Sequence, residues 1–176
     1  MTTTLFTNAH IATGEPGSTA ASTLPLQDIL VTDGVFTAFG PGLAQQYEAQ
    51  GGDPAAIEVV DLGGKLVCPP FCDTHLHLDY VFTARKPGAV NESGTLFEGI
   101  QRWSETKSDL TVDEIKQRAK IGIKKEMLHG VQLIRSHADV TDPNLTSLKA
   151  LLELKEELKD TVTLQIVSFP QEGMYS

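Results

Sequence analysis

The chain has 176 residues, of which 40% are hydrophobic and 21% charged, and its formal net charge is −9. This composition is typical of a globular protein and excludes a disordered chain. The acidic balance argues against nucleic acid or an anionic membrane as partner, because both are recognised by clustered Lys and Arg. The sequence contains neither an apolar run long enough to span a bilayer nor a basic-then-apolar N-terminal leader. We therefore expect a cytoplasmic protein.

Residues 1–68 predict a small β-rich module. Alternating apolar segments flank Asp33-Gly34 and predict a β-hairpin. Residues 57–67 predict a strand, a turn and a second strand, so we expect an antiparallel sheet of the β-sandwich type. Residues 13–25 and 40–56 are rich in Gly, Pro, Ala, Ser and Gln and are expected to form surface loops.

Residues 69–176 alternate between strand and helix patterns. This alternation is typical of a parallel sheet with helices packed outside it. A long connection follows the first strand and contains a helix near Leu96–Lys107. The expected strands are Phe71–His77, Val131–Asp139 and Val162–Phe169.

Two further helices are signalled by their ends. A capping box of Thr111 and Glu114 begins one, and Gly130 ends it. Its expected buried face is formed by residues four apart: Ile115, Ala119, Ile123 and Met127. Asp142-Pro143 is expected to open the next helix, with Pro at its first position. The expected buried stripe of that helix is Leu145, Leu148, Leu152 and Leu158.

The two cysteines, Cys68 and Cys72, lie close together in the sequence Cys-Pro-Pro-Phe-Cys. Neither the Cys-x-x-Cys spacing nor a second cysteine pair occurs, which argues against a zinc knuckle. We expect buried thiols in a reducing compartment.

The sharpest chemical signal is Asp73-Thr74-His75-Leu76-His77-Leu78-Asp79. Side chains alternate faces along a strand, so His75 and His77 are expected on one face. Two imidazoles placed in this way can bind one metal ion, at about 2.0–2.1 Å each. The alternative is a pair of hydrogen-bonded histidines at a strand end with no metal.

Several motifs occur in order along the chain. Pro69–Asp79 is followed by Ser93–Ile100 with Arg102-Trp103, by Arg135–Val140 and by Gln165–Gly173. This set resembles the amidohydrolase superfamily and, within it, the cytosine deaminases of bacteria. The resemblance covers residues 66–176 closely and the N-terminal module only in kind.

The resemblance implies an α/β fold, with about the first three strands of a (β/α)8 TIM-type barrel in residues 69–176. Residues 1–68 would be the preceding β-sandwich module. It further implies one divalent metal ion, Fe²⁺ or Zn²⁺, with His75 and His77 as its first two protein ligands. The implied reaction is hydrolytic deamination of cytosine by a metal-activated water.

Three residues are expected on the substrate side, and the resemblance implies the first of them. Gln171 matches an amide that reads the pyrimidine edge, because a carboxamide can both donate and accept a hydrogen bond. Leu96 is expected as a pocket wall. Arg135, His137 and Asp139 share one face of their strand, and His137 is interpreted as a support for the metal or a substrate contact. Alternatively, Gln171 is a turn residue and His137 a hydrogen-bonded buried histidine.

No acid–base residue of the family pattern falls within residues 1–176. A third His ligand, a proton-shuttling Glu, a further His and a metal-binding Asp are expected beyond residue 176, so we expect the isolated chain to be inactive. The expected partner is a homo-oligomer copy or a complementing C-terminal segment. Alternatives are a deaminase or amidohydrolase of a creatinine-, pterin- or triazine-like ring, and a non-catalytic truncated fragment.

Overall fold

The computed structural model describes residues 2–12 and 24–173. The chain divides into two compact units, Met1–Pro69 and Pro70–Ser176. The first is built around a mixed sheet and the second is an α/β unit with a parallel sheet. Of the first loop expected from the sequence, residues 13–23 lie outside the described part.

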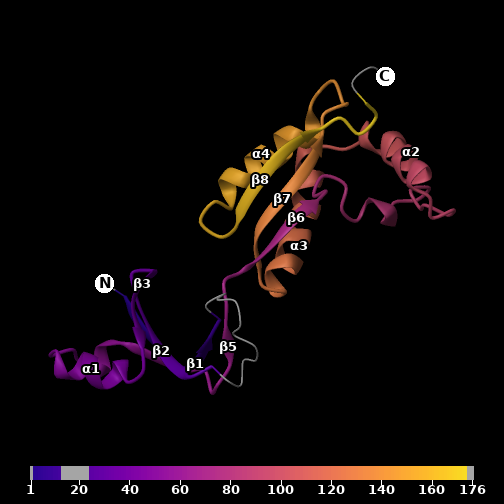
Figure 1. The fold of residues 1–176 in the computed structure, drawn as a ribbon. Coiled ribbons are helices and arrows are strands. Elements are labelled where there is room, and N and C mark those ends of the chain that lie inside the picture. Colours follow the sequence, from indigo (N-terminus) through magenta and orange to yellow (C-terminus); the bar gives the residue numbers. More distant parts are fainter. Residues whose placement is uncertain (1, 13–23, 174–176) are drawn as a thin grey trace. The chain divides into compact units, whose positions relative to one another are not determined.

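A single five-stranded sheet is the centre of the first unit (Figure 1). The central strand β1 pairs antiparallel with β2 and parallel with both β4 and β5. The expectation of an antiparallel sheet is therefore wrong. Strands β4 and β5 do not pair with each other as a hairpin, because each pairs in parallel with a different part of β1. The strands are β1 (Thr3–Ile11), β2 (Leu26–Thr32), β3 (Val35–Gly40), β4 (Glu58–Asp61) and β5 (Leu66–Val67).

The hairpin expected at Asp33-Gly34 is confirmed. It joins β2 to β3, which pair antiparallel from Thr32 and Val35 outward. Asp33 and Gly34 have φ angles of 49° and 78°, and two consecutive positive φ values are the requirement of the two-residue turn that matches strand twist.

The expected loop at residues 40–56 contains a short helix, so that expectation is corrected. Helix α1 spans Leu43–Ala49 and a 3-10 turn, η2, spans Pro54–Ala56. The sequence of α1, Leu-Ala-Gln-Gln-Tyr-Glu-Ala, is rich in good helix formers. The Gly and Pro residues on both sides of this short segment favour a loop, so the composition of residues 40–56 as a whole predicts no helix.

The second unit alternates strands and helices as expected. Strands β6 (Phe71–Leu76), β7 (Val131–Asp139) and β8 (Thr163–Phe169) form a parallel sheet in that order. The helical elements are η3 (Thr83–Arg85), α2 (Leu96–Lys107), α3 (Val112–Leu128) and α4 (Thr146–Glu157). Helices α3 and α4 pack together and against β7, while α2 lies toward the end of the sheet where the strands finish (Figure 1).

Helix α3 has the ends that its sequence predicts. The Thr111 hydroxyl accepts from the Glu114 N–H, and the Glu114 carboxylate accepts from the Thr111 N–H, which completes the capping box. Gly130 follows the helix with φ of +85°. Ile115, Ala119 and Ile123 are buried as expected, whereas Met127 is only partly buried against the core.

Helix α4 begins later than expected. The Asp142 carboxylate accepts from the backbone N–H of Asn144 and of Thr146, so Asp142-Pro143 forms a turn and the helix starts at Thr146. This shift changes the buried face, which consists of Ser147, Ala150, Leu151 and Leu154. The expected stripe is therefore only partly right, since Leu152 is half exposed.

The parallel sheet has two unlike faces. Ile134, Ser136 and Ala138 of β7 are buried beneath the helices and join the main apolar core. On the opposite face, Leu133 and Arg135 are exposed. Cys68 and Cys72 are exposed as well, which corrects the expectation of buried thiols. Cys72 pairs in register with Leu133, on the face that these helices do not cover.

Within residues 2–12 and 24–173, no helix has both the length and the apolar character needed to cross a membrane.

Candidate active site

The two histidines of the His-x-His motif lie at the carboxyl end of β6. The register between β6 and β7 shifts there, because the three steps from Asp73 to Leu76 run beside only two steps in β7. Such a bulge re-aims side chains at a strand end. The ring centroids of His75 and His77 are 5.2 Å apart, so the motif places two imidazoles together.

The ring of His77 is held by a backbone contact. Its Nδ1 lies 3.1 Å from the carbonyl oxygen of His137. A carbonyl only accepts, so Nδ1 carries the proton and Nε2 keeps its lone pair. Burial lowers the pKa of His77, and the neighbouring histidines add to this effect. His77 is therefore a neutral imidazole near pH 7, the form that binds metals.

His137 joins this group from the end of β7. Its ring stacks on His75 with a centroid distance of 4.1 Å, and it lies 5.6 Å from the ring of His77. Burial lowers the pKa of His137. Its Nδ1 is buried and has no hydrogen-bond partner among the described residues, although the ring also forms a backbone hydrogen bond with Leu76.

The donor set fits a transition metal but is incomplete. A backbone acceptor on the distal ring nitrogen, as His77 has, is the usual support of a histidine that ligates a metal. In the part of the chain that the structure describes, no three His, Cys, Asp or Glu side chains are arranged to hold one ion. Further ligands would have to come from elsewhere.

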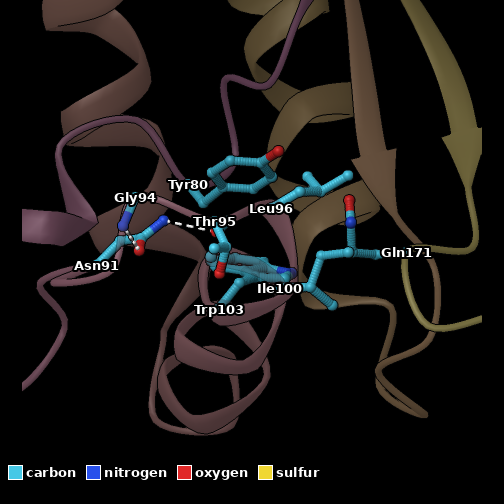
Figure 2. A pocket seen from close by; sticks show the side chains of 9 residues that line it. Tyr80, Asn91, Gly94, Thr95, Leu96, Ile100, Trp103 and Gln171 are labelled. Carbon is cyan, nitrogen blue, oxygen red and sulfur yellow. Dashed lines mark hydrogen bonds between the residues drawn. The ribbon is translucent and has the colours of Figure 1, made fainter.

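A cleft of about 370 Å³ opens beside the histidines at the same end of the sheet. Its volume lies within the range of small-molecule sites. Figure 2 shows Tyr80, Trp103 and Gln171 converging on it from three separate segments. The lining residues are Tyr80, Asn91, Gly94, Thr95, Leu96, Gly99, Ile100, Trp103 and Gln171.

Tyr80 connects the cleft to the histidines. One face of its ring stacks on His77 at a centroid distance of 4.6 Å, and the ring also contacts Trp103 at 4.8 Å. The histidine group and the cleft therefore adjoin each other at Tyr80.

The loop before α2 forms another wall of the cleft and is tied to that helix by Glu98. The Glu98 carboxylate accepts from the backbone N–H of Glu92 at 3.1 Å and of Ser93 at 2.7 Å. The hydrogen bonds from Ser93 and Glu92, aided by Arg102, lower the pKa of Glu98 to about 2. Thr95, the N-cap of α2, accepts from the Glu98 N–H and fixes the start of the helix.

Two buried carboxylates lie beneath the site. Asp79 is fully buried, and its Oδ2 accepts from the Asp139 N–H at 2.9 Å. Burial raises the pKa of Asp79 to about 6. Asp139 is 2% exposed and accepts from the Trp103 indole N–H and from Thr141. Burial alone would raise the pKa of Asp139, but these hydrogen bonds and the charge of Lys107 lower it overall.

Comparison with known proteins decides the family. Residues 58–176, more than half of the chain, match the amidohydrolase family.

The chain belongs to the amidohydrolase family.

Solved structures agree with this assignment. The 5-methylcytosine deaminase of Klebsiella pneumoniae, solved with 5-fluorocytosine, is 40% identical with a TM-score of 0.79; the match covers 98% of this chain and 38% of that one. The N-isopropylammelide isopropylaminohydrolase of Burkholderia multivorans is 25% identical with a TM-score of 0.73, over 99% of this chain and 39% of that one.

Two curated relatives also match the chain. The N-isopropylammelide isopropyl amidohydrolase of Pseudomonas sp. strain ADP is 35% identical over 66% of this chain and 30% of its own length. The pterin deaminase of Rhizobium rhizogenes is 28% identical over 84% of this chain and 32% of its own length. This amidohydrolase chain thus spans about a third of the length of the curated relatives that it matches.

The structure brings the expected site residues into two neighbouring groups. Leu96 and Gln171 line the cleft, although Leu96 remains 73% exposed. His75, His77 and His137 form the adjoining histidine group.

Sequence reasoning missed three residues that organise the site of this amidohydrolase: Tyr80, Trp103 and Lys107. Trp103 was visible only as part of a motif, and its partner Asp139 lies 36 residues away. The one available signal was that Asp139 shares strand parity with His137, which placed a carboxylate at the same strand end.

Proposed function

We propose that this chain supplies two metal ligands and a substrate-reading wall to a hydrolytic deaminase of cytosine or a closely related small cyclic amine. The proposed frame is a (β/α)8 barrel that begins with β6, β7 and β8, after a β-sandwich module in residues 1–68. The observation that carries the proposal is the contact of Tyr80 with both His77 and Trp103. Through it, a candidate metal site and a cleft of ligand size share one wall.

His75 and His77 would hold the divalent metal, Fe²⁺ or Zn²⁺. Such an ion, when bound, lowers the pKa of a coordinated water toward neutrality and so supplies a nucleophile. The His137 carbonyl keeps the proton of His77 on Nδ1 and directs Nε2 toward a ligand. The stacked ring of His137 limits the movement of His75.

Gln171 would read the ring of the substrate. It lies in the turn after β8 and lines the cleft. Its amide can donate to a ring carbonyl and accept from a ring N–H, the adjacent pair that a cytosine edge presents. Tyr80 and Trp103 give the cleft aromatic surfaces against which a flat heterocycle packs. Leu96 would cover the mouth.

The relatives support a nitrogen heterocycle as substrate. The names of the Klebsiella and Rhizobium proteins specify deamination of a cytosine and of a pterin, and the Pseudomonas protein acts on an N-alkylated triazine. We place cytosine-type pyrimidines first, because the 40% identical structure holds a cytosine analogue. The triazine is the second candidate, favoured by the 35% identical relative.

A substrate panel tests the proposal. The complete enzyme, in which the chain is joined by the expected C-terminal segment, is purified with its metal and assayed for ammonia release from cytosine, 5-methylcytosine and pterin, and for isopropylamine release from N-isopropylammelide. We expect the highest kcat/KM for one of the two cytosines. Preferential turnover of N-isopropylammelide would replace the pyrimidine assignment with the triazine one, and no C–N hydrolysis of any compound would overturn both.

A further inference from the structure

Lys107 holds three separate segments together with one ammonium group. Its Nζ donates to Asp139 Oδ2 at 3.2 Å, to Thr141 Oγ1 at 2.6 Å and to Glu172 Oε1 at 2.5 Å. An ammonium has three N–H bonds, and these three acceptors use all of them. The side chain is only 12% exposed, so this is not a solvated surface lysine.

The acceptors belong to different parts of the site. Lys107 is the last residue of α2, Asp139 the last residue of β7, and Glu172 lies in the turn after β8. That turn is closed by the Gly173 N–H, which donates to the Pro170 carbonyl at 3.0 Å. The contact with Glu172 therefore fastens the turn to the helix and to the neighbouring strand.

Gln171 lies inside this fastened turn. Within the described residues, its own side-chain amide has no hydrogen-bond partner that would fix its place, and that amide faces the cleft. Its position depends on the backbone of the turn, and Glu172 ties that turn to α2 through Lys107 and through a further side-chain hydrogen bond with Ser104.

The same cation also reaches the opposite wall. Asp139 Oδ2 accepts from both Lys107 Nζ and the indole N–H of Trp103. Trp103 lines the cleft, so one buried carboxylate oxygen links the aromatic wall to the turn that carries Gln171. If Lys107 moved away, the buried carboxylate of Asp139 would be left without its positive partner, which is unfavourable.

We infer that Lys107 is a positioning residue for substrate recognition: it sets where Gln171 stands relative to Trp103 by clamping the turn of residues 170–173. This inference rests on the proposed role of Gln171 in reading the substrate. Lys107 itself lies outside the cleft lining and acts through Glu172 and Asp139.

The clamp itself is tested without activity, by amide hydrogen exchange at Gly173 measured by NMR. In Lys107→Met and in Glu172→Gln we expect Gly173 to exchange about 10-fold faster or more, while buried amides of α3 keep their rates. Glu172→Gln leaves the buried Lys107–Asp139 pair in place, so this variant still tests the clamp if Lys107→Met does not fold. The control is Lys159→Met, since Lys159 is 59% exposed and pairs with Glu156. Unchanged exchange at Gly173 in both clamp variants would overturn the inference.

The route through Gln171 is tested by a double-mutant cycle in kcat/KM for the preferred substrate. We expect Lys107→Met to raise KM about 10-fold or more, and to add less than about twofold when Gln171 is already Ala, because coupled residues are not additive. Lys107→Arg should restore most of the loss. Additive effects would show that Lys107 does not act through Gln171. An inert Gln171→Ala would instead overturn the proposed reading of the substrate, while the Gly173 exchange still decides the clamp.

Discussion

The indole N–H of Trp103 donates a 2.7 Å hydrogen bond to Oδ2 of Asp139, and both residues are almost fully buried. Through this bond, helix α2 is docked on the carboxyl end of β7, where it forms one side of the cleft.

Trp103→Phe should therefore destabilise the fold. The variant keeps an aromatic ring but removes a donor from a buried carboxylate, which costs about 1.5–3 kcal/mol. The free energy of unfolding, from urea titration followed by circular dichroism, measures the loss. Tyr80→Phe is the matched control, because the described residues give the Tyr80 hydroxyl no hydrogen-bond partner, and we expect it to cost less than about 1 kcal/mol. If Trp103→Phe and Tyr80→Phe lowered the free energy of unfolding equally, the effect would come from ring packing and not from the hydrogen bond.

Glu98 predicts an acid-sensitive loop at the cleft. Hydrogen bonds from Ser93 and Glu92 lower the pKa of Glu98 from 4.5 to about 2. A lowered carboxyl pKa contributes stability that is present above pH 4.5 and is lost as the pH falls through about 2. The Ser93 amide proton, followed by NMR, should report this loss.

Glu98→Gln should release the same loop at neutral pH, because a neutral amide oxygen is a weaker acceptor than a carboxylate. We expect the chemical shift of the Ser93 amide proton to move toward the value of an unbonded amide. We also expect that this chemical shift no longer changes as the pH falls through the pKa of Glu98. Glu105→Gln makes the same change on the same helix, at a residue that pairs with Arg102 and is half exposed. A Ser93 signal that responds alike to both variants would contradict the assignment.

In the complete enzyme, His75→Ala and His77→Ala should each abolish metal retention while the fold persists. A lost ligand removes the fixed geometry on which affinity depends, so we expect binding of Zn²⁺ to weaken more than about 100-fold. Elemental analysis of the purified variants measures it. His129→Ala is the control, because His129 caps the far end of α3 and is exposed. Full metal occupancy with normal turnover in His75→Ala would show that the motif is structural.

Gln171→Ala should lower kcat/KM by more than the loss of a single contact would. Removal of the amide leaves a ring carbonyl and a ring N–H unpaired, at about 1–3 kcal/mol each. The two together predict a loss of roughly 30-fold to above 10⁴-fold in kcat/KM. Gln171→Glu should also be severely impaired, because a carboxylate facing the ring carbonyl has no donor. Losses below about fivefold in both variants, at equal metal content, would place Gln171 outside substrate recognition.

Local signals in the sequence were sufficient for several elements. The capping box at Thr111, the glycine at 130 and the Asp33-Gly34 turn each act within a few residues, so their consequences can be read from neighbouring letters. Strand alternation likewise indicated that His75 and His77 lie together. The family resemblance added Gln171, which does line the cleft.

Features set by distant partners could not be predicted in this way. The direction of β4 depends on β1, more than 50 residues earlier. The sequence predicts the start of α4 too early, because the Asp142 carboxylate accepts hydrogen bonds from the N–H groups of Asn144 and Thr146. These bonds hold Asp142-Pro143 in a turn before the helix. The Lys107 cluster joins residues 32 to 65 positions apart, and no local pattern marks a lysine that will be buried against two carboxylates.

Trp103 is the only tryptophan of the chain, and this has an optical consequence. Its indole lies 5% exposed against Tyr80 on the wall of the cleft. Fluorescence excited at the tryptophan band therefore comes from one known place, and a heterocycle that enters the cleft changes the surroundings of that fluorophore. The protein thus carries its own label for ligand occupancy, and titrations can follow binding without an attached dye or a catalytic turnover.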